Sequence, residues 1–190
     1  MILRFFRRDP RRELVESLYT RIAQASRQPG LYTEAEVPDT VEGRFECLSL
    51  HVILTFRHLR TLPAPAADVN QDLADALFRA LDLSLREMGV GDLAVPKKMK
   101  TLAEAFYGRA RAYDPLLDAR DLEALAVSLQ RNVTGGEEPA RRLAAYALDA
   151  EAGLKGQDLD AILADGPIFP TLEAGDAADD VPANPPGETR

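Results

Sequence analysis

Residues 89–100 hold the side chains of this chain that are best suited to bind something negative. The run reads Gly-Val-Gly-Asp-Leu-Ala-Val-Pro-Lys-Lys-Met-Lys, and Pro96 marks the start of a helix, since proline fits the first helical position. Lys97, Lys98 and Lys100 then crowd a first turn where each exposed cation costs about 0.3–1 kcal/mol. Free backbone N–H groups and three ammonium groups at such a turn suit a phosphate or a carboxylate.

Two interpretations of this run, which we call the basic turn, remain open at the level of sequence. One is a binding site for an anionic group, in which Gly89 and Gly91 let the backbone approach a partner closely. The other is a solvated helix start whose lysines cover apolar surface. Val95 is a poor N-cap and does not explain the pattern. A P-loop is excluded, because the required Gly-Lys-Ser/Thr ending is absent.

A second group of chemically interesting side chains follows at spacings of four and seven. Cys47, His51 and His58 lie on one predicted helix, and zinc accepts both ligand types. A structural zinc site needs four ligands, however, and the chain has a single cysteine. Arg57 and Arg60 beside His58 also disfavour a cation. We therefore expect a buried thiol, two hydrogen-bonded or exposed histidines, and no metal.

Catalytic motifs are weaker still. Ser49 lies near Cys47 and His51, but no Gly-x-Ser-x-Gly elbow surrounds it. The acidic residues are spaced mostly as helix ion pairs on solvent-facing positions. We expect a binding protein without cofactors rather than an enzyme.

The elements that must position these residues are predicted to be helical throughout, because the apolar spacing is helical and no convincing strand alternation occurs. We predict an all-α fold, a single domain of about six to seven helices around a buried central helix at 40–62, which is too apolar for one face. The other helices are expected at 9–27, 68–88, 96–113, from 115 to about 133, at 138–152 and at 157–164.

Local signals set the expected helix ends. Asp39 with Glu42 and Asp68 with Gln71 form capping boxes, and residues 31–38 are predicted to be an irregular connector. Asp114 and Pro115 predict a new helix start. Gly89 is expected to be a left-handed helix cap with Val90 packing back on Leu85. Gly108 inside a predicted helix either lets another helix approach or is a tolerated weakness.

Composition narrows the function classes. The 190 residues carry a net charge of -8, which argues against general nucleic-acid binding, DNA included. One cysteine fits a reducing compartment, and no apolar run approaches the length of a membrane span. Charges interrupt residues 1–8 where a signal peptide needs an apolar segment. We expect a cytoplasmic protein with a helical domain over residues 1–170 and an acidic, disordered tail over residues 171–190.

The amino-terminal segment allows two interpretations as well. Its isoleucine, leucine and two phenylalanines among five arginines have the composition of a helix that lies on an anionic membrane or docks on a partner. The plainer interpretation is a frayed start that packs two phenylalanines on the domain. The first would place the protein at the inner face of the cytoplasmic membrane.

Residues 81–92 (Leu-Asp-Leu-Ser-Leu-Arg-Glu-Met-Gly-Val-Gly-Asp), continued through residues 95–100 and the Ala-Phe-Tyr-Gly-Arg run at 105–109, resemble the signature of the ubiquinol–cytochrome c chaperone family. We expect no targeting presequence, so the resemblance is to a member of bacterial type. The resemblance is closest from about residue 82 to residue 109. It implies an all-helical, cofactor-free chaperone for assembly of the cytochrome bc complex, respiratory complex III. It further implies that the client is newly made cytochrome b or another immature subunit, and that a small helper protein and the ribosome are partners.

The predicted partner-binding surface combines this resemblance with the basic turn. Its members are Arg86, Glu87, Gly89, Val90, Gly91, Asp92, Lys97, Lys98, Lys100, Tyr107, Gly108 and Arg109. The competing hypothesis is a protein that binds a small anion or an anionic lipid head group through the same lysines.

Overall fold

The computed structural model describes residues 10–138 and 140–172, and this part of the chain contains helices and no strand. The predictions made for residues 1–9 and for the tail from residue 173 lie outside the described residues. The helices are α1 (Pro10–Ala25), α2 (Pro29–Thr33), α3 (Val41–Leu59), α4 (Ala66–Glu87), α5 (Val95–Ala119), α6 (Leu122–Leu129), the π-helical segment η1 (Gln130–Thr134), α7 (Arg141–Leu154) and α8 (Leu159–Asp165). The predicted all-α fold is confirmed, with eight α-helices in the described residues rather than six to seven.

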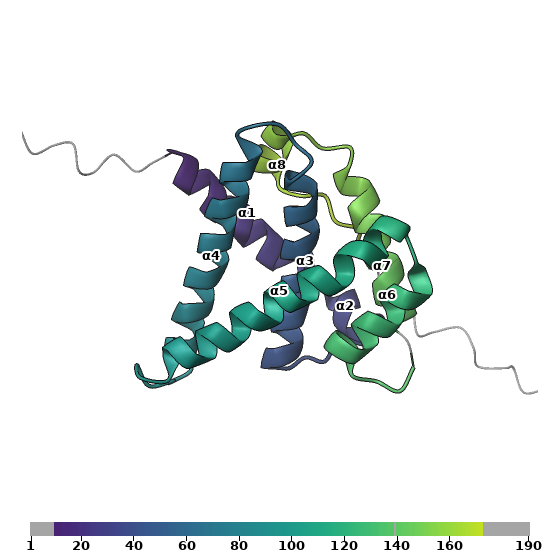
Figure 1. Ribbon diagram of the computed structural model, residues 1–190, viewed down its shortest axis with the longest axis horizontal. Coiled ribbons are helices and arrows are strands. Elements are labelled where there is room, and N and C mark those ends of the chain that lie inside the picture. Colours follow the sequence, from purple (N-terminus) through teal and green to yellow (C-terminus); the bar gives the residue numbers. More distant parts are fainter. Residues whose placement is uncertain (1–9, 139, 173–190) are drawn as a thin grey trace, which may run out of the picture.

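Helix α3 is the buried centre of the fold, as its all-round apolar sequence predicts. It packs against α1, α4, α5 and α7, and Figure 1 shows it running between α4 and α7 with α5 crossing it. Leu50, Ile53 and Leu54 on consecutive turns are almost completely inaccessible to solvent. The remaining helices therefore have one common apolar surface to cover, which accounts for the single core.

Helices α4 and α5 form a hairpin whose tip is the basic turn. Figure 1 shows α4 descending on one side of the molecule and α5 returning diagonally across α3, so that the tip lies at a lower corner. The two helices pack against each other and both contact α3. The turn is therefore carried by two long helices that are anchored in the core, while the turn itself projects from it.

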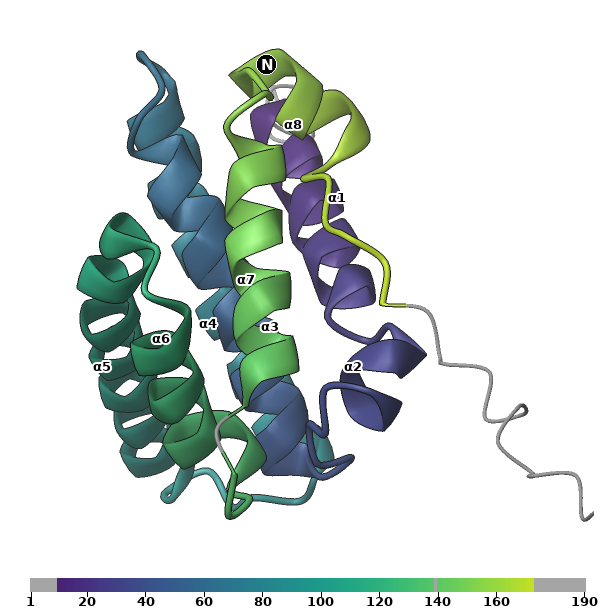
Figure 2. The ribbon, with the colours of Figure 1, turned by 90° about the vertical axis from the view of Figure 1, so that its right-hand side faces the viewer.

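On the other side of α3, the chain after α8 crosses back over the fold. Figure 2 shows this last described segment running beside α1 towards α2. The rings of Phe169 and His51 pack in a T-shaped arrangement with their centroids 4.7 Å apart, and the Gln28 side chain donates to the carbonyl of Pro170 at 3.2 Å. At Gly30 a Cβ would lie only 2.0 Å from the carbonyl oxygen of Leu172, so only glycine lets the segment pass.

Two predicted helix boundaries are wrong. Residues 31–38 are not all irregular, because Pro29 occupies the first turn of the short helix α2, a position that suits proline. Asp114 and Pro115 do not start a helix, because α5 continues through both to Ala119. Arg57 of α3 donates to the carbonyl and the carboxylate of Asp114, so Asp114 is held by a contact with another helix that the local sequence does not show.

The capping predictions for α3 and α4 are wrong in detail. Thr40, not Asp39, caps α3, with its hydroxyl accepting from the Gly43 N–H at 3.0 Å. Asp39 is instead ion-paired with Arg44. Helix α4 begins at Ala66 after Pro65, so Asp68 lies inside its first turn rather than at its cap.

Candidate functional site

The end of α4 is closed by a glycine cap of the predicted kind. Gly89 has a φ of 79°, its N–H donates to the Arg86 carbonyl at 2.9 Å, and the Val90 N–H reaches back to the Leu85 carbonyl at 3.0 Å. This pair of bonds defines a Schellman motif. A Cβ at Gly89 would touch nothing within 4 Å, so the glycine is needed for its backbone conformation and not for space.

The start of α5 offers an incoming anion few backbone donors. Ala94 occupies the N-cap position and Val95 is the first helical residue, one position earlier than predicted from Pro96. The N–H groups of Ala94 and Val95 both donate to the Gly91 carbonyl, at 2.8 and 3.3 Å. Pro96 has no N–H to offer. The backbone cradle that a small phosphate needs is therefore largely used up.

The ammonium groups of the basic turn are, by contrast, available. Lys97, Lys98 and Lys100 are all exposed. Lys100 lies 3.7 Å from the carboxylate of Glu104, whereas Lys97 and Lys98 form no ion pair with any residue that the structure describes. Val95, which is 1% exposed, holds the helix start against the fold. The turn thus presents two free positive charges on a firmly anchored backbone.

Arg86 and Asp92, both predicted to belong to the partner-binding surface, are brought together by the turn. The Arg86 guanidinium donates to Asp92 at 2.6 Å and to Asp82 at 2.7 Å. The hydrogen bond to Asp82, with a further contribution from Asp92, raises the pKa of Arg86. This pairing ties the end of α4 to the loop, and the two carboxylates offset the positive charge that Arg86 would otherwise present to a partner.

Arg109 is directed into the fold. Its Nη2 and Nε atoms donate to the two carboxylate oxygens of Glu46 on α3, at 2.9 and 3.1 Å. Burial raises the pKa of Glu46, and the hydrogen bond from Arg109 counteracts that rise. The arginine therefore joins α5 to α3, a role that its position in the sequence does not reveal.

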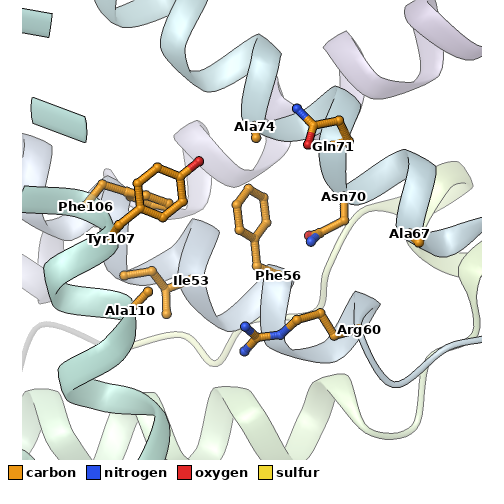
Figure 3. A pocket seen from close by; sticks show the side chains of 10 residues that line it. All are labelled: Ile53, Phe56, Arg60, Ala67, Asn70, Gln71, Ala74, Phe106, Tyr107 and Ala110. Atoms are coloured by element: carbon orange, nitrogen blue, oxygen red, sulfur yellow. The ribbon is translucent and has the colours of Figure 1, made fainter. Parts of the chain in front are cut away.

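Tyr107 and Gly108 lie on the outer side of α5. Tyr107 is 47% exposed and borders a cavity of about 250 Å³ between α3, α4 and α5. Figure 3 shows its ring beside those of Phe56 and Phe106, with the Asn70 and Gln71 amides opposite. A Cβ at Gly108 would meet nothing within 4 Å. No described helix needs this glycine for close approach.

A larger hollow was not predicted from the sequence. An apolar groove of about 440 Å³ lies between α1, α3, α4 and α5, next to the basic turn. Of the predicted surface residues, only Glu87 lines it. The apolar side chains that line the groove are Ala23, Val41, Phe45, Leu48, Leu81, Leu85, Met88 and Leu102. Their helical spacing is visible in the sequence, but it does not reveal which side chains another helix covers.

The histidines serve the fold. The Nδ1 of His51 lies 2.8 Å from the Cys47 carbonyl and its Nε2 lies 2.7 Å from the Tyr146 hydroxyl. Because a carbonyl can only accept, Nδ1 carries the proton and the tyrosine donates to Nε2. Burial lowers the pKa of His51 to about 4, so it is neutral at pH 7. His58 Nε2 lies 2.7 Å from the Gln157 carbonyl.

Within the residues that the structure describes, no group of three or more potential metal ligands comes together. No described helix is both long and apolar enough to cross a membrane. The described residues thus form a helical protein with an anchored basic turn beside an apolar groove, an arrangement that is suited to contact with another protein.

Comparison with known proteins gives the family. The model of the family described as Ubiquinol-cytochrome C chaperone matches residues 33–169, and the chain belongs to this family. The crystal structure of the Cbp3 homolog from Brucella abortus is 39% identical, with a TM-score of 0.77, and the match covers 90% of this chain and 98% of that one. No curated protein matches.

Proposed function

We propose that this protein is an assembly chaperone of the ubiquinol–cytochrome c reductase, respiratory complex III, and that it holds newly made cytochrome b without covalent chemistry. The observation that carries the proposal is the basic turn, whose Lys97 and Lys98 are exposed and have no ion-pair partner among the described residues. Family membership and the likeness to the Cbp3 homolog support the role in assembly.

The charge of the turn favours a client segment with acidic side chains or exposed backbone carbonyls. Two unpaired ammonium groups attract such a segment over several ångströms and set its register. Tyr107 and Gly108 lie further along the same helix and extend the contact surface. A small helper protein, the ribosome or the anionic surface of the cytoplasmic membrane would bring the client to this surface.

The proposal is tested by recovery of cytochrome b with the tagged full-length chain from cells that lack the mature bc complex. We expect a Lys97→Glu, Lys98→Glu double variant to recover much less cytochrome b than the wild type. A control with the same charge change is Arg111→Glu with Arg131→Glu, because both arginines are exposed and neither belongs to the basic turn. Equal recovery by the two double variants would contradict the proposal.

A binding protein for a small anion or an anionic lipid head group is the competing possibility. The occupied N–H groups at the start of α5 count against it. Calorimetry distinguishes this hypothesis from client binding. The wild type and a Lys97/Lys98/Lys100→Ala variant are titrated with phosphate, nucleotide and anionic lipid vesicles. Tight uptake that depends on the lysines would favour the small ligand and overturn the client-binding proposal.

A further inference from the structure

The apolar groove is built from two helical stripes that no third described helix covers. On α3 the lining positions are 41, 44, 45 and 48, and on α4 with its cap they are 81, 84, 85 and 88. Both sets follow the i, i+3, i+4, i+7 spacing of a single helix face. Such a face is normally buried against another element. Here Val41 is 58% exposed and Met88 is 52% exposed.

The shape of the groove suits a helix. Two neighbouring stripes of this spacing form a trough into which the ridge of a third helix can pack. Leu102 of α5 and Ala23 of α1 line the groove as well, so it has apolar contributions from four helices. Helix-in-groove recognition uses the same arrangement, with large aliphatic anchors from the incoming helix. Met88 can adapt its flexible side chain to such anchors.

The charges around the groove select the polar face of the incoming helix. Arg27 and Arg44 line the groove on its α1–α3 side. Arg44 is paired with Asp39 at 2.6 Å, whereas Arg27 forms no ion pair within the described part of the chain. Glu87 is the one carboxylate that lines the groove, on its α4 side. A helix with acidic residues towards Arg27 therefore complements this surface better than a basic one.

We infer that the apolar groove is a docking site for one amphipathic helix of a partner protein, with large aliphatic residues on its buried face and acidic residues beside them. The inference goes beyond the proposed function, since it rests on a different surface from the lysines of the basic turn. It holds for a helix of this chemistry whether or not cytochrome b is the client.

Fluorescence anisotropy with two synthetic helical peptides tests the inference on the purified full chain. The peptides share a leucine stripe and differ only in glutamate or lysine at the flanking positions. We expect the glutamate peptide to bind at least about ten-fold more tightly. Arg27→Glu should abolish or reverse this preference. Equal binding of the two peptides, or a preference that survives Arg27→Glu, would overturn the inference.

Two variants on α4 place the binding in the groove. Ser84 is exposed and lines the groove, so Ser84→Trp should fill it and lower peptide affinity by at least about ten-fold. Leu83 is 55% exposed on the same helix and is not a lining residue, so Leu83→Trp should leave the affinity unchanged. An equal loss in both variants, or a loss in neither, would place the peptide elsewhere and defeat the inference.

A further variant answers the objection that a tryptophan disturbs the fold. Met88 is 52% exposed, so Met88→Glu adds a charge in the groove without removing a buried side chain. We expect it to weaken the glutamate peptide and strengthen the lysine peptide. Circular dichroism and thermal unfolding of each variant show that the fold is retained. Unchanged affinities for both peptides in a folded Met88→Glu protein would refute the inference independently.

Discussion

Two arginines with the same chemistry show how differently two regions of this molecule are built. Arg57 of α3 pairs with three carboxylates, those of Asp114, Asp118 and Glu151, at 2.6–2.9 Å. Arg86 at the end of α4 pairs with two, those of Asp82 and Asp92, at 2.6–2.7 Å. The Arg57 side chain is 11% exposed and that of Arg86 is 46% exposed. The two arginines therefore form similar numbers of ion pairs, but those of Arg86 are much more accessible to water.

This difference extends to the surroundings of each arginine. Around α3 and α7 several buried polar groups find partners within the chain, as the bonds of His51 and of the Arg57 Nη atoms show, although Ser49 Oγ and Arg57 Nε have none among the described residues. At the α4–α5 hairpin the lysines and the groove are left open to solvent. The buried interactions around α3 and α7 therefore contribute most to the stability of the fold. At the α4–α5 hairpin Lys97 and Lys98 lack ion-pair partners within the described part of the chain, so binding of another protein there gains the most free energy.

The largest expected effect comes from Arg57→Met. Loss of the Arg57 guanidinium would leave Glu151, whose side chain is 8% exposed, as a buried charge. The remaining ion-pair partner of Glu151 is Lys155 at 3.4 Å. Breaking a buried ion pair from one side costs about 3–5 kcal/mol of unfolding free energy. Urea unfolding of Arg57→Met and Arg86→Met measures the difference between the two regions. Similar midpoints for the two variants would contradict the comparison.

The next effect is the dependence of stability on pH through His51. Its pKa is about 4 in the fold because of burial, against 6.5 for the free side chain. The unfolded chain therefore binds one more proton between these values, so the contribution to stability is complete above pH 6.5 and is lost as pH falls towards 4. The expected slope from this group is about 1.4 kcal/mol per pH unit.

Comparison with His51→Gln isolates this slope from those of the carboxylates. Unfolding free energies of both proteins are measured by urea titration from pH 7 to pH 4. We expect the wild type to lose stability more steeply than the variant over this interval. Parallel curves would show that His51 titrates normally and that the α3–α7 region is open to water.

A smaller effect is expected in the open region. Gly89 has a positive φ, which costs an alanine about 1 kcal/mol, so Gly89→Ala should destabilise the protein by about that amount. Gly91 has no positive φ, and a Cβ there would also meet nothing. Gly91→Ala should therefore leave the unfolding temperature unchanged. Equal effects in the two variants would mean that the Schellman cap does not fix the turn.

These cases also show what can be predicted from the sequence. The Gly89 cap was predictable because the spacing of a few neighbouring residues determines it. The buried centre at α3 was predictable because its apolar residues cover every face. Both features depend on local chain properties alone.

The features that were not predictable depend on residues far apart in the chain. Arg109 is 63 residues from Glu46, so the sequence could not show that its charge is used internally. Where α5 continues through Pro115, the preceding residue Asp114 is bonded by Arg57 of another helix. The apolar groove arises because no described helix lies over two neighbouring stripes, and amphipathic spacing does not reveal which stripes stay uncovered.

The smallest expected effect on stability is an increase, and it comes from a substitution in α5 that should affect stability and client binding in opposite directions. Gly108 lies inside this helix, and a Cβ there would meet nothing within 4 Å. Gly108→Ala should therefore stabilise the protein by about 0.5–1 kcal/mol, since alanine is the better helix former. If Gly108 belongs to the contact surface for the client, as we propose, the added methyl group should also lower the recovery of cytochrome b.

Thr101→Ala is the matched control, because Thr101 is exposed on the same helix and gains helix propensity in the same way. It should raise the unfolding temperature without changing the recovery of cytochrome b. Thermal unfolding and co-purification on the same three proteins give both readouts. If Gly108→Ala is more stable and recovers as much cytochrome b as Thr101→Ala, then Gly108 is a tolerated weakness of the helix and does not belong to the client surface. A rise in stability with a loss of recovery places the client on the outer face of α5, at the exposed region that the core does not use.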